Sequence, residues 1–112
     1  MNPEQTTFLT PPDFKLQVGY IIHPAGHEIP RHIHLPLKRH IIGTAEVLVV
    51  HNGHCEIDIY NDERQLVATR ELGTGDIMIM VGGGHGFRML ENTVLLEVKQ
   101  GPYPGVEEKE RF

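Results

Sequence analysis

The feature that most constrains this chain is a series of short runs, six to nine residues long, that are rich in Val, Ile, Leu, Tyr and Met. Turn sequences such as "HPAG", "NDER", "GTGD" and "GGG" separate them. No window keeps the i, i+3, i+4, i+7 spacing over the ten or more residues that a helix needs. The runs occupy residues 14–22, 45–51, 54–61, 65–72, 76–81, 85–90 and 93–98. The pattern predicts an all-β fold of about eight short antiparallel strands, in a sandwich or barrel that leaves few exposed edges.

Two connections between these runs predict specific turns. Asn52-Gly53 lies between two apolar runs and predicts a two-residue hairpin of type I′, which needs positive φ angles. The stretch "YNDERQL", residues 60–66, predicts a second, looser hairpin.

The length of 112 residues is enough for one domain with one core. We therefore expect a single domain over residues 1–112. A polar, proline-containing arm covers about residues 1–13, and a tail rich in Gly, Pro and charge covers about residues 101–112. The arm is expected to be loose or an edge strand, and the tail to be a surface or packing segment.

Charge and apolar content exclude several classes of function. The formal net charge is −5, whereas a nucleic-acid surface needs a basic face, so no nucleic-acid partner is expected. No apolar run approaches about 18 residues and no signal-peptide pattern opens the sequence, so we expect a cytoplasmic protein without a membrane partner. The single cysteine, Cys55, alternates with polar residues in "HCEIDIY" and is predicted to be buried beside Ile57 and Ile59.

Histidines are concentrated in one part of the chain. Six of the eight lie between residues 26 and 54. His32 and His34 are two residues apart in a segment bounded by prolines, and an extended backbone would put both imidazoles on one face, about 7 Å apart along the strand. Two such side chains can converge on one metal ion.

Two further residues are candidate ligands. Glu46 shares a strand face with Leu48 and Val50; either this face is the core and Glu46 is an inward carboxylate that needs a cation, or Val47 and Val49 lie inside instead. His85 follows three glycines, which let the backbone pass close to another group, and it shares its face with Phe87 and Met89.

Together these residues resemble the two sequence motifs of the cupin superfamily. Gly26, the five residues "HEIPR" and His32-Ile33-His34 match the opening of the first motif. Glu46, the six residues "VLVVHN" and Gly53 match its end. The second motif begins at Gly75-Asp76 and reaches His85, without the family's proline. The resemblance covers roughly residues 14–100.

The resemblance implies a cupin-type jelly-roll barrel that holds one divalent transition metal (Fe, Mn, Ni, Cu or Zn) through His32, His34, Glu46 and His85. Eleven residues separate His34 from Glu46, where the family has about three or four. An alternative register therefore uses His40, with Lys38 in place of the first histidine. We prefer His32 and His34, which keep the full spacing from Gly26.

The resemblance implies a metal-dependent protein that acts on a small polar or anionic molecule by oxygenation or isomerisation. The alternative is a non-catalytic module that binds a sugar or another small ligand, and the similarity of "VKQGPYPG" to cupins of surface-polysaccharide biosynthesis suggests the same setting. Catalytic residues cannot be named from the sequence, and whether the chain is an enzyme stays open.

The remaining candidates have simpler interpretations. His51 and His54 flank the Asn-Gly turn and are expected at a solvated hairpin end, as are His23 and His27 around "PAG". Arg88 has the opposite strand parity to His85 and is expected to be a surface charge. The apolar Phe8 and Leu9 and the tail are suited to wrapping a partner, so we expect a homodimer.

Overall fold

The structure is a computed structural model that describes residues 3–102, 105 and 109–112. Over these residues it contains strands and no helix. All strand pairs are antiparallel, which confirms the predicted all-β fold of short antiparallel strands. The strands are β1 (Thr7–Phe8), β2 (Gly19–Tyr20), β3 (Glu46–Asn52), β4 (His54–Tyr60), β5 (Leu66–Gly73), β6 (Ile77–Met80), β7 (Gly84–Met89) and β8 (Val94–Lys99).

The chain divides into two compact units, residues 1–42 and 43–112. In the first unit, β1 pairs with β2, and the ring of Phe8 lies against Gly19, where a Cβ atom would be 2.7 Å from Cδ1 of the ring. The Thr10 hydroxyl donates a hydrogen bond to Oε1 of Gln17 at 2.9 Å. The apolar run predicted at residues 14–22 is therefore a strand only at Gly19–Tyr20, and the N-terminal arm contributes its short partner.

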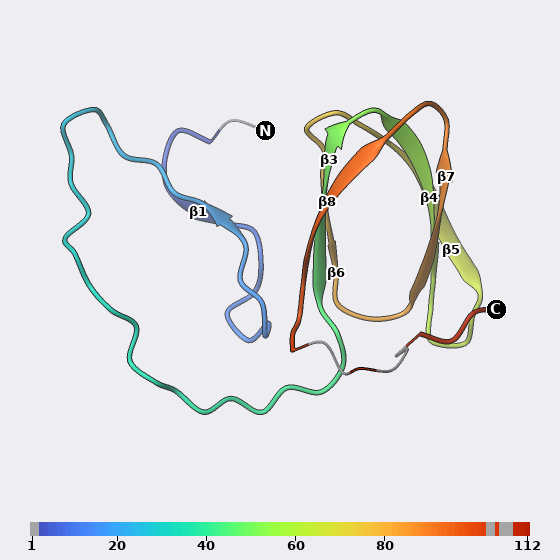
Figure 1. Cartoon of the computed structure of the whole chain (residues 1–112), viewed down its shortest axis with the longest axis horizontal. Helices are drawn as coiled ribbons and strands as arrows, with labels where there is room; N and C mark the ends of the chain where they lie inside the picture. The colour runs from blue at the N-terminus through green and yellow to red at the C-terminus, as the bar shows by residue number, and fades with distance from the viewer. Residues whose placement is uncertain (1–2, 103–104, 106–108) are drawn as a thin grey trace. The chain divides into compact units, whose positions relative to one another are not determined.

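The second unit consists of two three-stranded sheets that face each other, with strand orders β6-β3-β8 and β5-β4-β7 (Figure 1). The central strands are β3 and β4, and all six strands fall on the predicted runs. Strand pairing sets which residues share a face. Leu48 is opposite Met78 on β6 and Glu97 on β8, and Ile57 is opposite Arg70 on β5 and Phe87 on β7.

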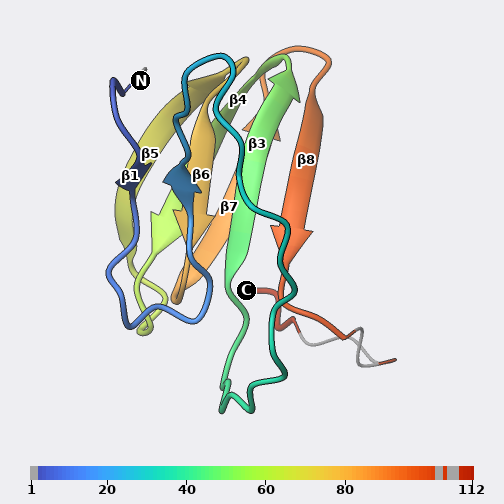
Figure 2. The same ribbon diagram turned by 90° about the vertical axis from the view of Figure 1, so that its left-hand side faces the viewer.

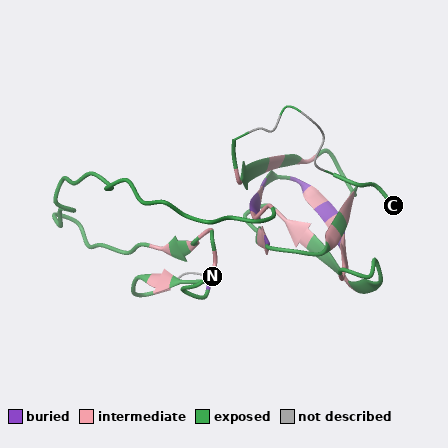
Figure 3. Ribbon diagram, turned by 90° about the horizontal axis from the view of Figure 1, so that it is seen from below, coloured by how far each residue is buried: buried purple, intermediate pink, exposed green. Residues whose placement is uncertain are grey.

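The core of this unit lies between the two sheets. Leu48, Ile57 and Met80 form its buried centre, and Figure 3 shows the buried positions on the strands. The partly buried residues Ile59, Leu72, Met78, Phe87 and Leu95 pack around them. Cys55 is 0% exposed, which confirms its predicted place inside the sheet, and burial raises the pKa of its thiol.

The connection at Asn52-Gly53 corrects one prediction, because it is not a type I′ hairpin turn. The strands β3 and β4 belong to different sheets, and only Gly53, not Asn52, has a positive φ angle (126°). The chain crosses here from one sheet to the other, close to the loop before β8: a Cβ atom on Gly53 would lie 2.7 Å from the Asn92 carbonyl oxygen. An Asn-Gly pair reports only local turn geometry, whereas here each flanking strand pairs with strands more distant in the sequence.

The second predicted hairpin is present between β4 and β5. The amide of Asn61 donates to the Gln65 carbonyl at 3.0 Å, and its side-chain oxygen accepts hydrogen bonds from the amides of Glu63 and Gln65. Arg64 has a positive φ angle of 63° in this turn. The side chain of Asn61 therefore closes the loop that joins the two strands.

Candidate functional site

Glu46 lies on the inner face of its sheet. Glu46, Leu48 and Val50 are 8%, 6% and 2% exposed, so the even-numbered face of β3 is the core face. Of the two arrangements that the sequence left open, the structure has the inward carboxylate. A buried carboxylate is costly unless a cation or hydrogen-bond donors offset its charge. Glu46 is therefore an unusual residue at the start of β3, because the next two inward positions of this strand are the apolar Leu48 and Val50.

His85 comes to the same place from the opposite sheet. It pairs with Ile59 in register, and its ring lies edge-on to Phe87 with 5.8 Å between centroids. The glycines before it set its position: Gly83 has a φ angle of 70°, and a Cβ atom there would lie 2.3 Å from the Tyr60 carbonyl oxygen. Nε2 of His85 is 3.7 Å from Oε2 of Glu46, with side-chain exposures of 32% and 11%. The pair thus bridges the two sheets.

A pocket of about 950 Å³ surrounds this pair within the second unit. Its apolar wall includes the core residues Leu48, Met80, Phe87 and Leu95. The polar side chains on its lining include Glu46, His85 and Tyr60. The lining is thus both polar and apolar, and small-molecule sites of this size likewise combine an apolar wall with a few convergent polar groups.

The strand β8 contributes a pocket residue that the sequence analysis did not identify. Glu97 is opposite Leu48 in register, and it lines the pocket with its carboxylate 4.0 Å from Nζ of Lys99. Lys99 in turn is opposite Glu46. Glu97 has the same strand parity as Leu95, which packs on the core, but apolar residues on both faces of this strand hide that signal in the sequence.

The last four residues, 109–112, also line the pocket. The sequence predicts a surface or packing segment here but not what this segment contacts. The ring of Phe112 lies edge-on to Tyr60 with 5.1 Å between centroids, and the Arg64 guanidinium is 5.3 Å from the centre of the same ring. Nη2 of Arg64 is 2.6 Å from Oε2 of Glu110. Gly84 gives the ring room, because a Cβ atom there would be 2.9 Å from Cζ of Phe112. Other parts of the predicted tail, residues 103–104 and 106–108, lie outside the described residues.

His32 and His34 belong to the first unit. Their rings are neighbours, with 5.2 Å between centroids, and Nδ1 of His32 is 2.8 Å from the Pro30 carbonyl oxygen. Both residues are exposed, and so is His40. The described residues contain no group of three or more His, Cys, Asp or Glu side chains arranged to hold a metal ion. The four-ligand site, and the choice between His34 and His40, stay predictions.

The geometry of the Glu46 and His85 pair is compatible with one metal ion. A carboxylate oxygen and an imidazole nitrogen that bind the same ion at about 2.1 Å lie roughly 3.0–3.4 Å apart. The observed 3.7 Å is within a small side-chain rotation of that separation. These two residues can therefore supply one oxygen and one nitrogen donor, a set that suits divalent transition metals.

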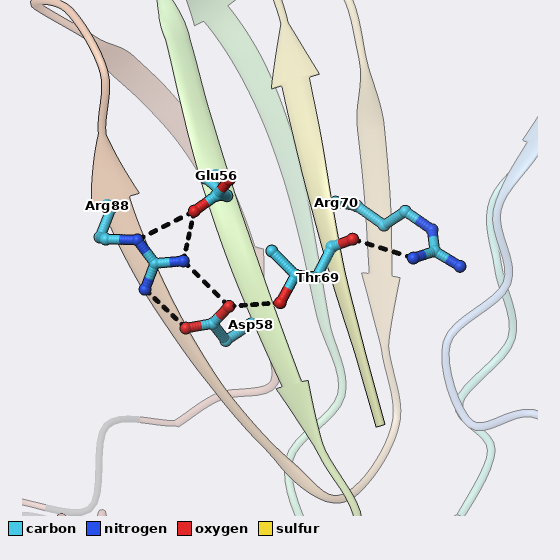
Figure 4. Close-up of polar contacts among 5 residues, drawn as sticks. All are labelled: Glu56, Asp58, Thr69, Arg70 and Arg88. Atoms are coloured by element: carbon cyan, nitrogen blue, oxygen red, sulfur yellow. Dashed lines mark hydrogen bonds and ion pairs between the residues drawn. The ribbon is translucent and has the colours of Figure 1, made fainter. Parts of the chain in front are cut away.

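A second polar cluster lies on the outer face of the β5-β4-β7 sheet (Figure 4). Arg88 donates hydrogen bonds to Glu56 and Asp58, including 2.6 Å from Nη1 to Oδ2 of Asp58. Thr69 donates a further bond to Asp58 at 2.7 Å. The Arg88 and Thr69 bonds lower the pKa of Asp58 to about 2, and the two carboxylates raise that of Arg88. Arg88 is thus an outward residue, as predicted.

The histidines near the β3–β4 crossing lie at the surface. His51 is exposed, and Nε2 of His54 is 3.3 Å from Oε2 of Glu71 on β5. His23 and His27 stack on each other with 4.6 Å between ring centroids. None of these four lines the pocket around Glu46 and His85.

No family model, curated protein or solved structure matches this chain. In the described part of the chain, no helix has the length and hydropathy to cross a membrane. The site must therefore be interpreted from its own chemistry.

Proposed function

We propose that this protein binds a divalent transition metal in the pocket of its second unit and uses it to hold a small polar or anionic molecule. Glu46 and His85 are two of the proposed ligands, and the motif spacing in the sequence adds His32 and His34 as the others. The observation that carries the proposal is the buried Glu46 carboxylate facing His85 at the wall of a 950 Å³ pocket. A metal ion bound between Glu46 and His85 would place a cation next to this buried carboxylate.

The fold that we propose is the cupin-type jelly roll. Two facing antiparallel sheets and the spacing of Gly26, His32, His34, Glu46 and Gly53 support it. A bound metal with an open coordination position would polarise a substrate through its oxygen atoms, as oxygenation and isomerisation require. The apolar wall of the pocket, with Leu48 and Phe87, would exclude water around the bound molecule.

A second candidate is a binding module that takes a sugar or another small ligand without turnover. The observation that favours it is that, among the described residues, no third metal-ligating side chain is grouped with the Glu46 carboxylate and the His85 imidazole. Hydroxyl groups of a sugar can bind such a pair directly, and the aromatic residues Tyr60 and Phe87 line the same pocket and could contact its apolar side.

Elemental analysis of protein purified without a histidine tag tests the metal site. We expect about one equivalent of metal in the wild type and a marked loss in His85→Ala, Glu46→Ala and His34→Ala. His51→Ala is the matched control, because this exposed histidine lies outside the pocket. The His40→Ala variant decides the register, since it keeps the metal only if His32 and His34 are the ligands.

The results separate the two candidate functions. Full metal content in both His32→Ala and His34→Ala would contradict the four-ligand site. A protein without metal that binds sugars, and loses binding in Glu46→Ala, would support the second candidate. Product formation that depends on added metal would establish an enzyme.

A further inference from the structure

The outer face of the β6-β3-β8 sheet is apolar, although its inner face already packs on the core. Strand pairing places Val47 beside Ile79 and Val98, and Val49 beside Ile77 and Leu96, all pointing away from Leu48. Val47 is buried at the centre, but Ile77, Leu96 and Val98 are 39%, 56% and 49% exposed. An antiparallel sheet with one face on the core normally turns polar side chains to water on the other.

The other sheet of the same unit follows that normal arrangement. The outer face of β5-β4-β7 carries Glu56, Asp58, Thr69 and Arg88, joined by hydrogen bonds and ion pairs (Figure 4). The two outer faces therefore differ in kind. One suits water, whereas the other presents Val, Ile and Leu on every strand of the sheet. Figure 2 shows the three strands of this sheet, β6, β3 and β8, side by side.

We propose that two copies of this chain associate through the outer face of the β6-β3-β8 sheet. The outward positions that pair in register on its three strands carry no charged side chain, so a two-fold contact would bury no charge and bring no like charges together. Two such faces can pack as aligned sheets about 10 Å apart, with the Val, Ile and Leu side chains interdigitating.

The size of the face is compatible with a weak, reversible association. Its exposed apolar area is on the order of 500 Å², the size of the largest patch on a typical monomer, which is often a functional surface. Two copies would bury on the order of 1,000 Å² in total, the lower end for specific interfaces. We therefore expect a dimer with a dissociation constant in the micromolar range.

This interface is independent of the proposed metal site. Glu46, Glu97 and Leu48 point to the inner face of the sheet, where they line the pocket. Association on the outer face would leave the pocket accessible, so metal content and dimer formation can be measured separately. Loss of one would not imply loss of the other.

Sedimentation velocity of the full chain, from low micromolar to several hundred micromolar, tests the proposal. The perturbing variant is Leu96→Lys, which puts an ammonium group of each copy into the apolar contact. We expect the dissociation constant to rise by about 100-fold or more. The matched control is Val67→Lys, because Val67 is 58% exposed on β5 of the other sheet, and it should leave the dimer unchanged.

Circular dichroism spectra establish that each variant keeps its β-structure. If Leu96→Lys does not fold, Ile77→Lys tests the same face from β6. A wild-type chain that stays monomeric over the whole range overturns the proposal, and so does a dimer whose dissociation constant Leu96→Lys leaves unchanged. A dimer that weakens in Leu96→Lys and not in Val67→Lys supports it.

Discussion

Replacing Glu46 with glutamine should have opposite effects on stability with and without metal. The Glu46 side chain is 11% exposed and has His85 at 3.7 Å. Burial of a carboxylate carries a desolvation cost that a neutral side chain of the same shape avoids. Because Gln keeps the shape and removes the charge, we expect the free energy of unfolding of chelated Glu46→Gln to exceed that of chelated wild type by about 1–2 kcal/mol.

Added metal should reverse this order. Binding to the folded state alone stabilises it by about 2.7 kcal/mol when the free metal is a hundredfold above Kd. If loss of the carboxylate raises Kd about 100-fold, the same metal concentration stabilises the variant by only about 0.4 kcal/mol. Wild type should then be the more stable protein.

Urea unfolding followed by circular dichroism, with chelator and with excess metal, measures both differences. Glu97→Gln is the matched control, because Glu97 lines the same pocket with 44% of its side chain exposed. Its stability should stay within about 0.5 kcal/mol of wild type in both conditions. If chelated Glu46→Gln is less stable than wild type, the carboxylate supports the fold, and if both proteins gain equally from metal, Glu46 is not a ligand.

Three further predictions concern the framework of the second unit. Gly83→Ala should lower the free energy of unfolding by about 2–4 kcal/mol, since its φ angle is 70° and a Cβ atom would meet the Tyr60 carbonyl oxygen at 2.3 Å. Gly82→Ala, with open space at its Cβ, should change it by less than about 1 kcal/mol in the same urea assay. Ile57→Ala should cost about 2–5 kcal/mol in thermal or urea unfolding because Ile57 is 1% exposed, and a cost below about 1 kcal/mol would contradict its place at the core centre. The pKa of Asp58 is lowered from 3.8 to about 2 in the folded state, so the unfolded chain binds more protons between these values, and stability should fall as pH decreases from about 4 to 2. Arg88→Gln should flatten that fall in a series of melting curves, and an equal slope in both proteins would argue against the pairing.

The strands of the second unit were predictable because alternation and turn residues agree there. In β4, "HCEIDIY" alternates between the buried Cys55 and Ile57 and the outward Glu56 and Asp58, so both boundaries and faces follow from the sequence. The run at residues 14–22 was predicted by the same criteria, yet only Gly19–Tyr20 pair as a strand. The composition of this run could not show that its pairing partner in the first unit is only the two-residue strand β1.

The site was predictable only in part, for a physical reason visible in β8. Its sequence "VLLEVK" suggests that Val94, Leu96 and Val98 point inward and Glu97 outward. The pairing with β3 shows the opposite, since Glu97 lies opposite Leu48. When both faces of a sheet are apolar, the period of two no longer identifies the core side. His85 could be named as a candidate without using the period of two, because the glycines before it indicate a close approach of the backbone to another group.

The same ambiguity explains why the inward position of Glu46 is informative. Both faces of β3 are apolar beyond its first residue, so a shift of one residue would exchange Leu48 and Val50 for Val47 and Val49 in the core. That alternative would bury a similar apolar area and would leave Glu46 in water. The structure instead has the register that places Met78 and Met80 of β6 beside Glu46 and Leu48 on the inner face. Met and Leu side chains are flexible and can fill irregular space beside the pocket, whereas the outward positions of β3 and β6 carry the stiffer β-branched Val and Ile. The fold therefore accepts a buried carboxylate that a one-residue shift would avoid, and the proposed ligand role facing His85 would give that carboxylate a physical reason.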